Sequence, residues 1–269
     1  MMIGEREFDF TRPYIVGVVN VTPDSFSGDG VLDIKKAVAQ GKQMVLQGAD
    51  IIDVGGESSR PGAKPVSVQD ELKRVLPVVE GLVKEKILVS IDTSKPKVAE
   101  ACLKAGAHMI NDITSGRDKK MFLLATKYNV PIILMHMKGT PRNMQENPSY
   151  TDVVGEVALF FKERIVAAKR YGVKKIILDP GIGFGKRVID NLVLLKNLNV
   201  FTKLGCPLFI GASRKSFIGK LTGAEVQDRL PGTLAAHLLA VLNGANLLRC
   251  HDVKEHVQAL TILDSVLRS

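Results

Sequence analysis

The sequence predicts an α/β protein that closes into a (β/α)8 TIM barrel, as a single domain over residues 1–269. Short apolar runs without helical spacing alternate with longer amphipathic patterns along the whole chain, as expected when helices connect parallel strands. The alternation occurs eight times, which favours a closed barrel over an open sheet. The chain is 45% hydrophobic and has no break in composition, so one large core is expected.

The first half of the chain supplies four expected strands. The run IVGVVN at 15–20 is followed by VTPDSFSGDG, a loop rich in turn formers. Helical patterns end near glycines, and proline or hydroxyl residues favour helix starts. The next strands are DIIDV at 50–54, ILVSID at 87–92 and HMINDI at 108–113, with helices at about 33–48, 69–85 and 93–106.

The second half repeats the pattern with longer polar loops. The loop KGTPRNMQENPS follows one strand, and RKSFIGKLTG follows another and is expected to be a loop throughout. The strands are PIILMHM at 131–137, IIL at 176–178, PLFIGAS at 207–213 and ANLLRCH at 245–251, and the helices are at about 118–128, 151–170, 189–203, 231–243 and 253–267.

The stretch KIILDPGIGFGK at 175–186 is the centre of the expected site. Its apolar run predicts a strand buried on both faces, and Pro180 ends that strand. Three glycines then allow a tight turn that approaches a ligand closely. Asp179 at the strand end needs hydrogen-bond donors. It either caps the next helix or receives two parallel N–H groups of a ligand.

Composition narrows the class of protein. The net charge is +9, but Lys and Arg are scattered and Trp is absent, which favours anionic small molecules over nucleic acid. The three cysteines are widely spaced, so neither a disulfide framework nor a zinc site is indicated. We expect no signal peptide, no membrane span and a cytoplasmic location.

Chemistry in a barrel of this kind lies at the carboxyl ends of the strands. Asp92, Asn111 and Asp179 suit the edge of a flat nitrogen heterocycle, which presents donors and acceptors side by side. Asp92 as a helix cap and Asn111 as a strand end remain alternatives. The polar residues at predicted strand ends are Asn20, Asp53, Glu57, Asp92, Asn111, Asp179, Lys215, Arg249 and His251.

The last and first strands are neighbours in a closed barrel, which suggests an anion site between them. Arg249 and His251 could hold a diphosphate, and Asn20 could meet its magnesium ion through an oxygen. Lys215 could bind a ring carbonyl or an anion, or belong to a merely basic loop. Other histidines carry less weight: His136 is a weak site candidate, His108 and His237 are expected to pack, and His256 is expected to be solvated.

These residues resemble a known family. VVNVTPDSFS, DIIDVGGESSRPGA, SIDTSKP, INDI, LMHMKGTP, ILDPGIGFGK, GASRKSFIG and RCHDV occur in the order found in the dihydropteroate synthases, which are pterin-binding enzymes, and cover almost the full length. The resemblance implies a transferase of folate biosynthesis that joins 4-aminobenzoate to 6-hydroxymethyl-7,8-dihydropterin diphosphate and releases pyrophosphate. It also implies Mg2+ as cofactor and a homodimer.

The resemblance assigns roles to individual residues. Those implied for the pterin are Asp92, Asn111, Met135, Asp179, Phe184 and Lys215. Those implied for 4-aminobenzoate are Phe26, Ser59, Pro61 and Ser216. Those implied for the diphosphate are Asn20, Arg60, Arg249 and His251, with Asn20 also at the metal, and these four act in catalysis together with Lys215.

Two departures and two alternatives accompany the resemblance. Ser59 stands where the family usually has Thr, and SFSGDG replaces SFSDGG, so the acid falls at Asp29. A methyltetrahydrofolate-binding methyltransferase would share the pterin floor but would not need SRKSF or RCHD. A non-catalytic pterin-binding protein is the other alternative. A modified pterin substrate also stays open.

Overall fold

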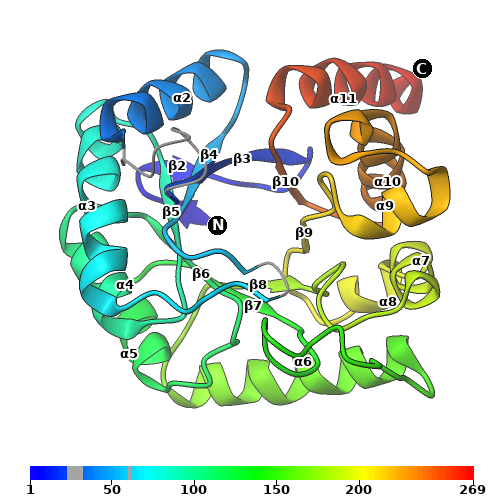
Figure 1. Cartoon of the computed structure of the whole chain (residues 1–269), viewed down its shortest axis with the longest axis horizontal. Helices are drawn as coiled ribbons and strands as arrows, with labels where there is room; N and C mark the ends of the chain where they lie inside the picture. Colours follow the sequence, from blue (N-terminus) through cyan, green and yellow to red (C-terminus); the bar gives the residue numbers. More distant parts are fainter. Residues whose placement is uncertain (23–32, 60–61) are drawn as a thin grey trace.

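The computed structural model describes residues 1–22, 33–59 and 62–269. Its centre is a parallel eight-stranded sheet in the order β8-β7-β6-β5-β4-β3-β10-β9. A parallel bridge between Leu178 and Leu208 joins the two ends of this order. The closed barrel confirms the predicted fold class (Figure 1). The strands are β3 (Tyr14–Asn20), β4 (Ile51–Gly55), β5 (Val89–Asp92), β6 (Met109–Asp112), β7 (Ile132–Met135), β8 (Ile176–Asp179), β9 (Phe209–Ile210) and β10 (Leu247–Cys250).

Helices surround this barrel on the outside (Figure 1). Within the described residues, none of them is both long enough and apolar enough to span a bilayer. The helices are α2 (Ile34–Leu46), α3 (Val68–Lys84), α4 (Pro96–Lys104), α5 (Lys120–Lys127), α6 (Val153–Arg170), α7 (Val188–Lys196), α8 (Asn199–Thr202), α9 (Ser216–Thr222), the 3-10 helix η1 (Val226–Asp228), α10 (Leu230–Leu242) and α11 (Val253–Arg268).

Side chains alternate between the inside of the barrel and the helix layer, because a strand has a two-residue period. Ile51 packs in the inner cluster, whereas Ile52 packs in the outer one. Leu247 and Leu248 of β10 divide in the same way. The inner cluster consists of Ile3, Phe8, Tyr14, Val16, Ile51, Met109, Ile133, Ile177, Phe209 and Leu247.

The amino-terminal segment closes the bottom of the barrel, which sequence patterns did not reveal. Strands β1 (Met2–Ile3) and β2 (Arg6–Glu7) form a small antiparallel hairpin. Ile3 and Phe8 are fully buried within the inner cluster. The inner cluster therefore fills the amino-terminal part of the barrel interior with apolar side chains, and the polar residues predicted for the site lie at the carboxyl ends of the strands.

Two predicted elements were wrong in detail. The helix expected at 189–203 is interrupted between α7 and α8, where Asn197 donates its side-chain N–H to the Val193 carbonyl. Such bonds compete with the helical backbone pattern. The segment expected as a loop after β9 contains α9, which ends at Gly223 with a left-handed φ of 74°. A short helix inside a glycine-containing polar stretch gives little periodicity to detect.

Candidate active site

A connected polar network lies across the carboxyl end of the barrel. The Asp53 Oδ2 atom accepts from Asn111 Nδ2 at 3.0 Å and from Arg249 Nε at 2.6 Å. The Arg249 Nη2 atom donates to Asp92 Oδ2 at 2.8 Å. The four residues come from β4, β5, β6 and β10, and their register places all of them on the inward face. The barrel therefore brings three predicted site residues together around Asp53.

Asp53 is the member of this network that sequence reasoning left without a role. Its side chain is buried, and its Oδ1 atom has no partner within the described structure. A buried carboxylate oxygen without a donor is costly, and it is an acceptor available to a ligand or water. Burial also raises the pKa of Asp92, against the opposing charge of Arg249. The sequence feature that could have identified Asp53 is its place near the carboxyl end of a strand, at a position that faces the inside of the barrel.

Asp179 lies on β8, with its carboxylate at the start of the glycine-rich turn. Its Oδ1 atom accepts the Gly181 N–H at 2.7 Å. Burial raises the pKa of Asp179 to about 6, which the Gly181 N–H and Lys215 oppose. Gly181 has a φ of +67°, and a Cβ there would lie 2.0 Å from the His136 carbonyl oxygen. A side chain at this position would push the turn away from β7.

The Lys186 side chain binds the carbonyl groups of the glycine-rich turn, a role that the sequence analysis did not predict. The side chain is buried, and its Nζ atom lies 2.9 Å from the Gly181 carbonyl and 3.0 Å from the Phe184 carbonyl. It also contacts His136 Nδ1 at 3.0 Å and the His136 carbonyl at 3.2 Å. Burial lowers the pKa of Lys186 to about 7 and that of His136 to about 3. His136 is therefore a neutral acceptor for Lys186, at the edge of the site.

An apolar wall borders the carboxylates. Met135, Met144 and Phe184 form a small buried cluster of their own. The Lys215 ammonium lies 4.0 Å from the centre of the Phe184 ring, within cation–π range. Three residues that the resemblance implies for the pterin, Met135, Phe184 and Lys215, thus lie next to one another.

The side of the rim formed by β9 and β10 carries the predicted anion contacts. The His251 Nδ1 atom lies 3.0 Å from Ser213 Oγ. Burial, with the charges of Arg249 and Arg214, lowers the pKa of His251 to about 4, so the ring is neutral near pH 7. Asn20 ends β3 beside Gly55 and is partly exposed, and Ser216 is exposed at the start of α9.

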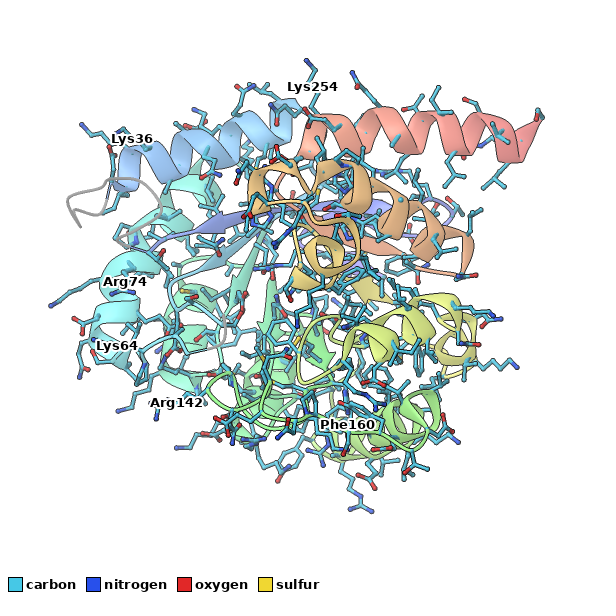
Figure 2. The ribbon with its side chains drawn as sticks, turned by 45° about the vertical axis from the view of Figure 1, so that its right-hand side comes forward. Lys36, Lys64, Arg74, Arg142, Phe160 and Lys254 are labelled. Carbon is cyan, nitrogen blue, oxygen red and sulfur yellow. The ribbon has the colours of Figure 1, made fainter. Side chains whose placement is uncertain are left out.

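The second rim loop, residues 56–67, is held at its two ends by a partly buried ion cluster. Lys95 Nζ donates to Glu57 Oε2 at 2.5 Å and also to the fully buried Glu71. Glu57 Oε1 accepts the Val66 N–H at 2.9 Å, which brings the two ends of the loop together. Arg74 of α3 donates to the Gly56 carbonyl at 2.9 Å, and Figure 2 labels Arg74 on this helix. Phe26, Asp29, Arg60 and Pro61 lie outside the described residues.

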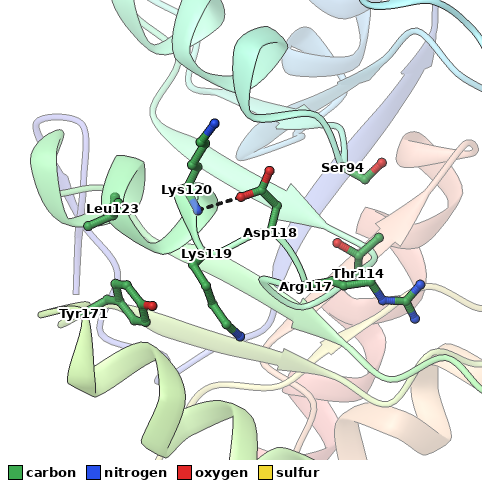
Figure 3. Close-up of a pocket in the computed structure, with 8 residues that line it drawn as sticks. All are labelled: Ser94, Thr114, Arg117, Asp118, Lys119, Lys120, Leu123 and Tyr171. Atoms are coloured by element: carbon green, nitrogen blue, oxygen red, sulfur yellow. Dashed lines mark hydrogen bonds between the residues drawn. The ribbon is translucent and has the colours of Figure 1, made fainter.

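Two cavities lie near the β5 and β6 connections. The first, of about 290 Å³, is lined by Ser59, Asp92 and Arg142 among others, so Ser59 faces the same space as Asp92. The second, of about 730 Å³, is lined by Arg117, Lys119 and Tyr171 among others (Figure 3). Among the predicted site residues that the structure describes, none lines the second cavity.

Comparison with known proteins identifies the family. The model of the family described as pterin binding enzymes matches residues 16–251. Dihydropteroate synthase of Escherichia coli (strain K12) is 45% identical over 263 residues, covering 96% of this chain and 93% of the relative. The chain belongs to the dihydropteroate synthase family of pterin-binding enzymes.

Solved structures agree with this family in fold. Yersinia pestis dihydropteroate synthase, in a sulfonamide drug complex, has a TM-score of 0.95 and 41% identity, covering 100% of this chain and 99% of that one. Xanthomonas albilineans dihydropteroate synthase with 4-aminobenzoic acid has a TM-score of 0.93 and 45% identity, covering 99% and 97%. The chain is thus a transferase of this family, and the methyltransferase alternative is not supported.

Proposed function

We propose that the network at the carboxyl end of the barrel binds the pterin substrate of this dihydropteroate synthase. The enzyme joins 6-hydroxymethyl-7,8-dihydropterin diphosphate to 4-aminobenzoate, which gives 7,8-dihydropteroate and pyrophosphate. The observation that carries the proposal is the set of inward polar groups, Asp53, Asp92, Asn111 and Asp179, above an apolar floor. These groups fit a flat ring with alternating donors and acceptors.

In this proposal Asp179 accepts two parallel N–H groups of the pterin. Its pKa of about 6 leaves it ionised near neutral pH, as an acceptor of paired bonds must be. Met135 and Phe184 cover one face of the ring, and Lys215, held against Phe184, contacts the ring edge. Asp92 and Asn111 complete the set of ring contacts.

The diphosphate lies toward β10 in this arrangement. Arg249 Nε and Nη2 already donate to Asp53 and Asp92. The remaining N–H groups of the guanidinium would therefore face the diphosphate. His251 adds a neutral imidazole that donates through Nε2 when Ser213 donates to Nδ1. Arg60 and Asn20 are the further expected contacts. Together these groups would stabilise charge that develops on the leaving diphosphate.

The bond changes are a substitution at the exocyclic methylene carbon of the pterin. Its C–O bond to the diphosphate breaks, and the lone pair of the 4-aminobenzoate amine forms the new C–N bond. The amine then loses one proton, and pyrophosphate departs with the electron pair of the broken bond. The amine is uncharged near neutral pH, so no activated side-chain nucleophile is needed.

Magnesium fits the donor chemistry of this rim. Asn20 offers an amide oxygen, a ligand type that Mg2+ accepts, and the substrate diphosphate offers more oxygens. No group of three or more His, Cys, Asp or Glu suited to a metal occurs in the described ranges. Asn20 would therefore meet an ion that arrives with the diphosphate, and the ion would offset the charge of the leaving group.

The 4-aminobenzoate is proposed to bind between the loop VTPDSFSGDG at 21–30, the second rim loop and α9. Ser59 borders the cavity that also contains Asp92, and Ser216 begins α9 as an exposed hydroxyl. Phe26 and Pro61, outside the described residues, are the expected ring contacts. The X. albilineans relative binds the same aromatic acid, which supports this assignment.

The remaining proposals concern the whole chain. We take residues 1–269 as one pterin-binding domain that acts in the cytoplasm as a homodimer, on small molecules rather than nucleic acid. Exposed Ile189 and Leu192 on α7 and Leu239 and Leu242 on α10 support a dimer, since such apolar patches often mark interfaces. These two helices are linked by Asn243, which donates to the Leu195 carbonyl at 2.9 Å.

Release of pyrophosphate from the two substrates tests the proposed function. Release that depends on both substrates, with formation of 7,8-dihydropteroate, is expected. Binding of the pterin without release would support the non-catalytic alternative. Turnover only with a modified pterin would revise the substrate.

A further inference from the structure

Two backbone N–H groups of the loop before Lys215 donate to successive turns of α10. Ala212 N donates to His237 Nε2 at 2.9 Å, and Arg214 N donates to Thr233 Oγ1 at 2.9 Å. Thr233 and His237 are both buried and lie four residues apart, on one face of the helix. Arg214 has a φ of 56°, a conformation that a non-glycine residue keeps only when its surroundings hold it. Helix α10 thus holds this loop from behind.

His256 of α11 supports His237 in turn. It was expected to be solvated, but it is 1% exposed, because α11 packs its inner face on α10. His237 Nδ1 lies 2.8 Å from His256 Nε2, and His256 Nδ1 lies 2.6 Å from the Asp252 carbonyl oxygen. The pair therefore links the loop before Lys215 to the turn that follows His251.

The two end groups of this series of hydrogen bonds, the Ala212 N–H and the Asp252 carbonyl, determine the direction of each bond in it. The Ala212 amide can only donate, so His237 Nε2 accepts and the proton of a neutral ring is on Nδ1. His237 Nδ1 then donates to His256 Nε2, and His256 Nδ1 donates to the Asp252 carbonyl, which can only accept. Every polar atom of both rings is used once. A proton added to either ring would place two donors face to face.

We propose that His237 and His256 are positioning residues that fix Lys215 at the rim, and that they do so only while both rings are neutral. Lys215 directly follows the segment whose amides are held by α10. Displacement of that segment would move the ammonium away from the Phe184 ring and the pterin edge. The proposal rests on the role proposed above for Lys215.

Charged side chains of both signs lie around the His237–His256 pair. Arg214 makes a bidentate ion pair with Asp252, and Glu255 is the next acid on α11. The Arg229 side chain of the η1–α10 junction reaches the Arg214 carbonyl at 3.2 Å. Burial lowers the pKa of both histidines, and the neighbouring His256 lowers the pKa of His237 further. Both rings are therefore neutral near pH 7, and acid disturbs them.

Two substitutions of His237 distinguish the loss of its hydrogen bonds from a general loss of the fold. His237→Leu leaves the Ala212 N–H without an acceptor, and KM for the pterin diphosphate should rise about fivefold or more, the low end of the cost of one buried unpaired donor. His237→Gln keeps an acceptor and a donor and should restore KM to near the wild-type value. The double variant His237→Gln, His256→Gln should weaken the rise of KM at pH values well below 6.5, because burial lowers the pKa of both rings from that value. The pH dependence that Asp179 causes near pH 6 should remain in this variant.

His108 provides a matched control. It is a partly buried histidine near the amino end of the barrel, whose Nδ1 accepts the Val89 N–H at 3.1 Å and whose pKa is also lowered by burial. His108→Gln should leave KM and its pH dependence as in the wild type. Failure of the proposed function itself would be visible separately, because the wild-type protein would then release no pyrophosphate.

Nitrogen-15 NMR of the imidazoles tests the geometry without reference to activity. We expect the Nδ1–H tautomer at both His237 and His256. A proton on Nε2 of His237 at neutral pH would overturn the proposal, as would a folded His237→Leu protein with unchanged KM. If that variant does not fold, the tautomers and the pH profile of the double variant decide the question.

Discussion

Asp179→Asn is the most informative perturbation of the site. The substitution keeps an oxygen that can accept the Gly181 N–H, which in the native protein is 2.7 Å from Oδ1. It replaces the second carboxylate oxygen by an NH2 group, so one pterin N–H would face a donor instead of an acceptor. The turn should therefore persist while the paired contact with the ring is lost.

The expected loss follows from burial. Asp179 is 6% exposed, so water cannot replace the missing acceptor. Truncating one partner of a buried charged hydrogen bond costs about 2–5 kcal/mol, which corresponds to a loss of affinity of about 30-fold or more. Calorimetric titration with the pterin alcohol, which lacks the diphosphate, measures this contact directly. An affinity equal to that of the wild type would refute the role of Asp179.

Asp112→Asn is the matched control. Asp112 is also a buried aspartate at a strand end, but it accepts from Thr114 and Gly116 on the outer side of β6. The control should lower the temperature of unfolding without changing pterin affinity. In the wild type, affinity should fall as the pH falls below about 6, because protonation of Asp179, whose pKa is raised to about 6, removes an acceptor.

Four further outcomes are expected. Lys186→Met should weaken pterin binding by about tenfold, because the carbonyls of His136, Gly181 and Phe184 lose the ammonium that donates to them. Calorimetry with unchanged affinity would contradict this. Lys95→Met should raise KM for 4-aminobenzoate, because Glu57 at the base of the second rim loop loses the ammonium that donates to it. Binding of the pterin alcohol should be unchanged, and equal effects on both ligands would argue against a local role. Chelation of magnesium should stop turnover but leave binding of the pterin alcohol intact, and tight magnesium binding to the free protein would count against an ion carried by the diphosphate. In titrations, 4-aminobenzoate should bind more strongly when pyrophosphate, magnesium and a pterin are present. Arg60→Ala should remove much of this gain in affinity. The same affinity with and without pyrophosphate would mean that the pocket is preformed.

The sequence by itself determined the architecture and most of the rim. Eight apolar runs, each followed by a helical pattern, predicted the barrel, because local periodicity reflects burial on strands and helices. The ends of those runs identified Asp92, Asn111, Asp179 and Arg249, since carboxyl ends of parallel strands share one side of the sheet. Glycines in KIILDPGIGFGK indicated a turn of unusual conformation, as Gly181 shows with its φ of +67°.

Only the tertiary structure decided which of these groups touch. Asp53 and Asn111 are separated by 58 residues, and Asp53 and Arg249 by 196, so their contacts exist only because the curved sheet brings β4, β6 and β10 together. The anchoring of Lys186 depends on a turn that folds back over it, and the burial of His256 depends on how α11 lies against α10. Local patterns record which face of an element is buried. They do not record what meets that face, since partners distant in the chain are set by packing.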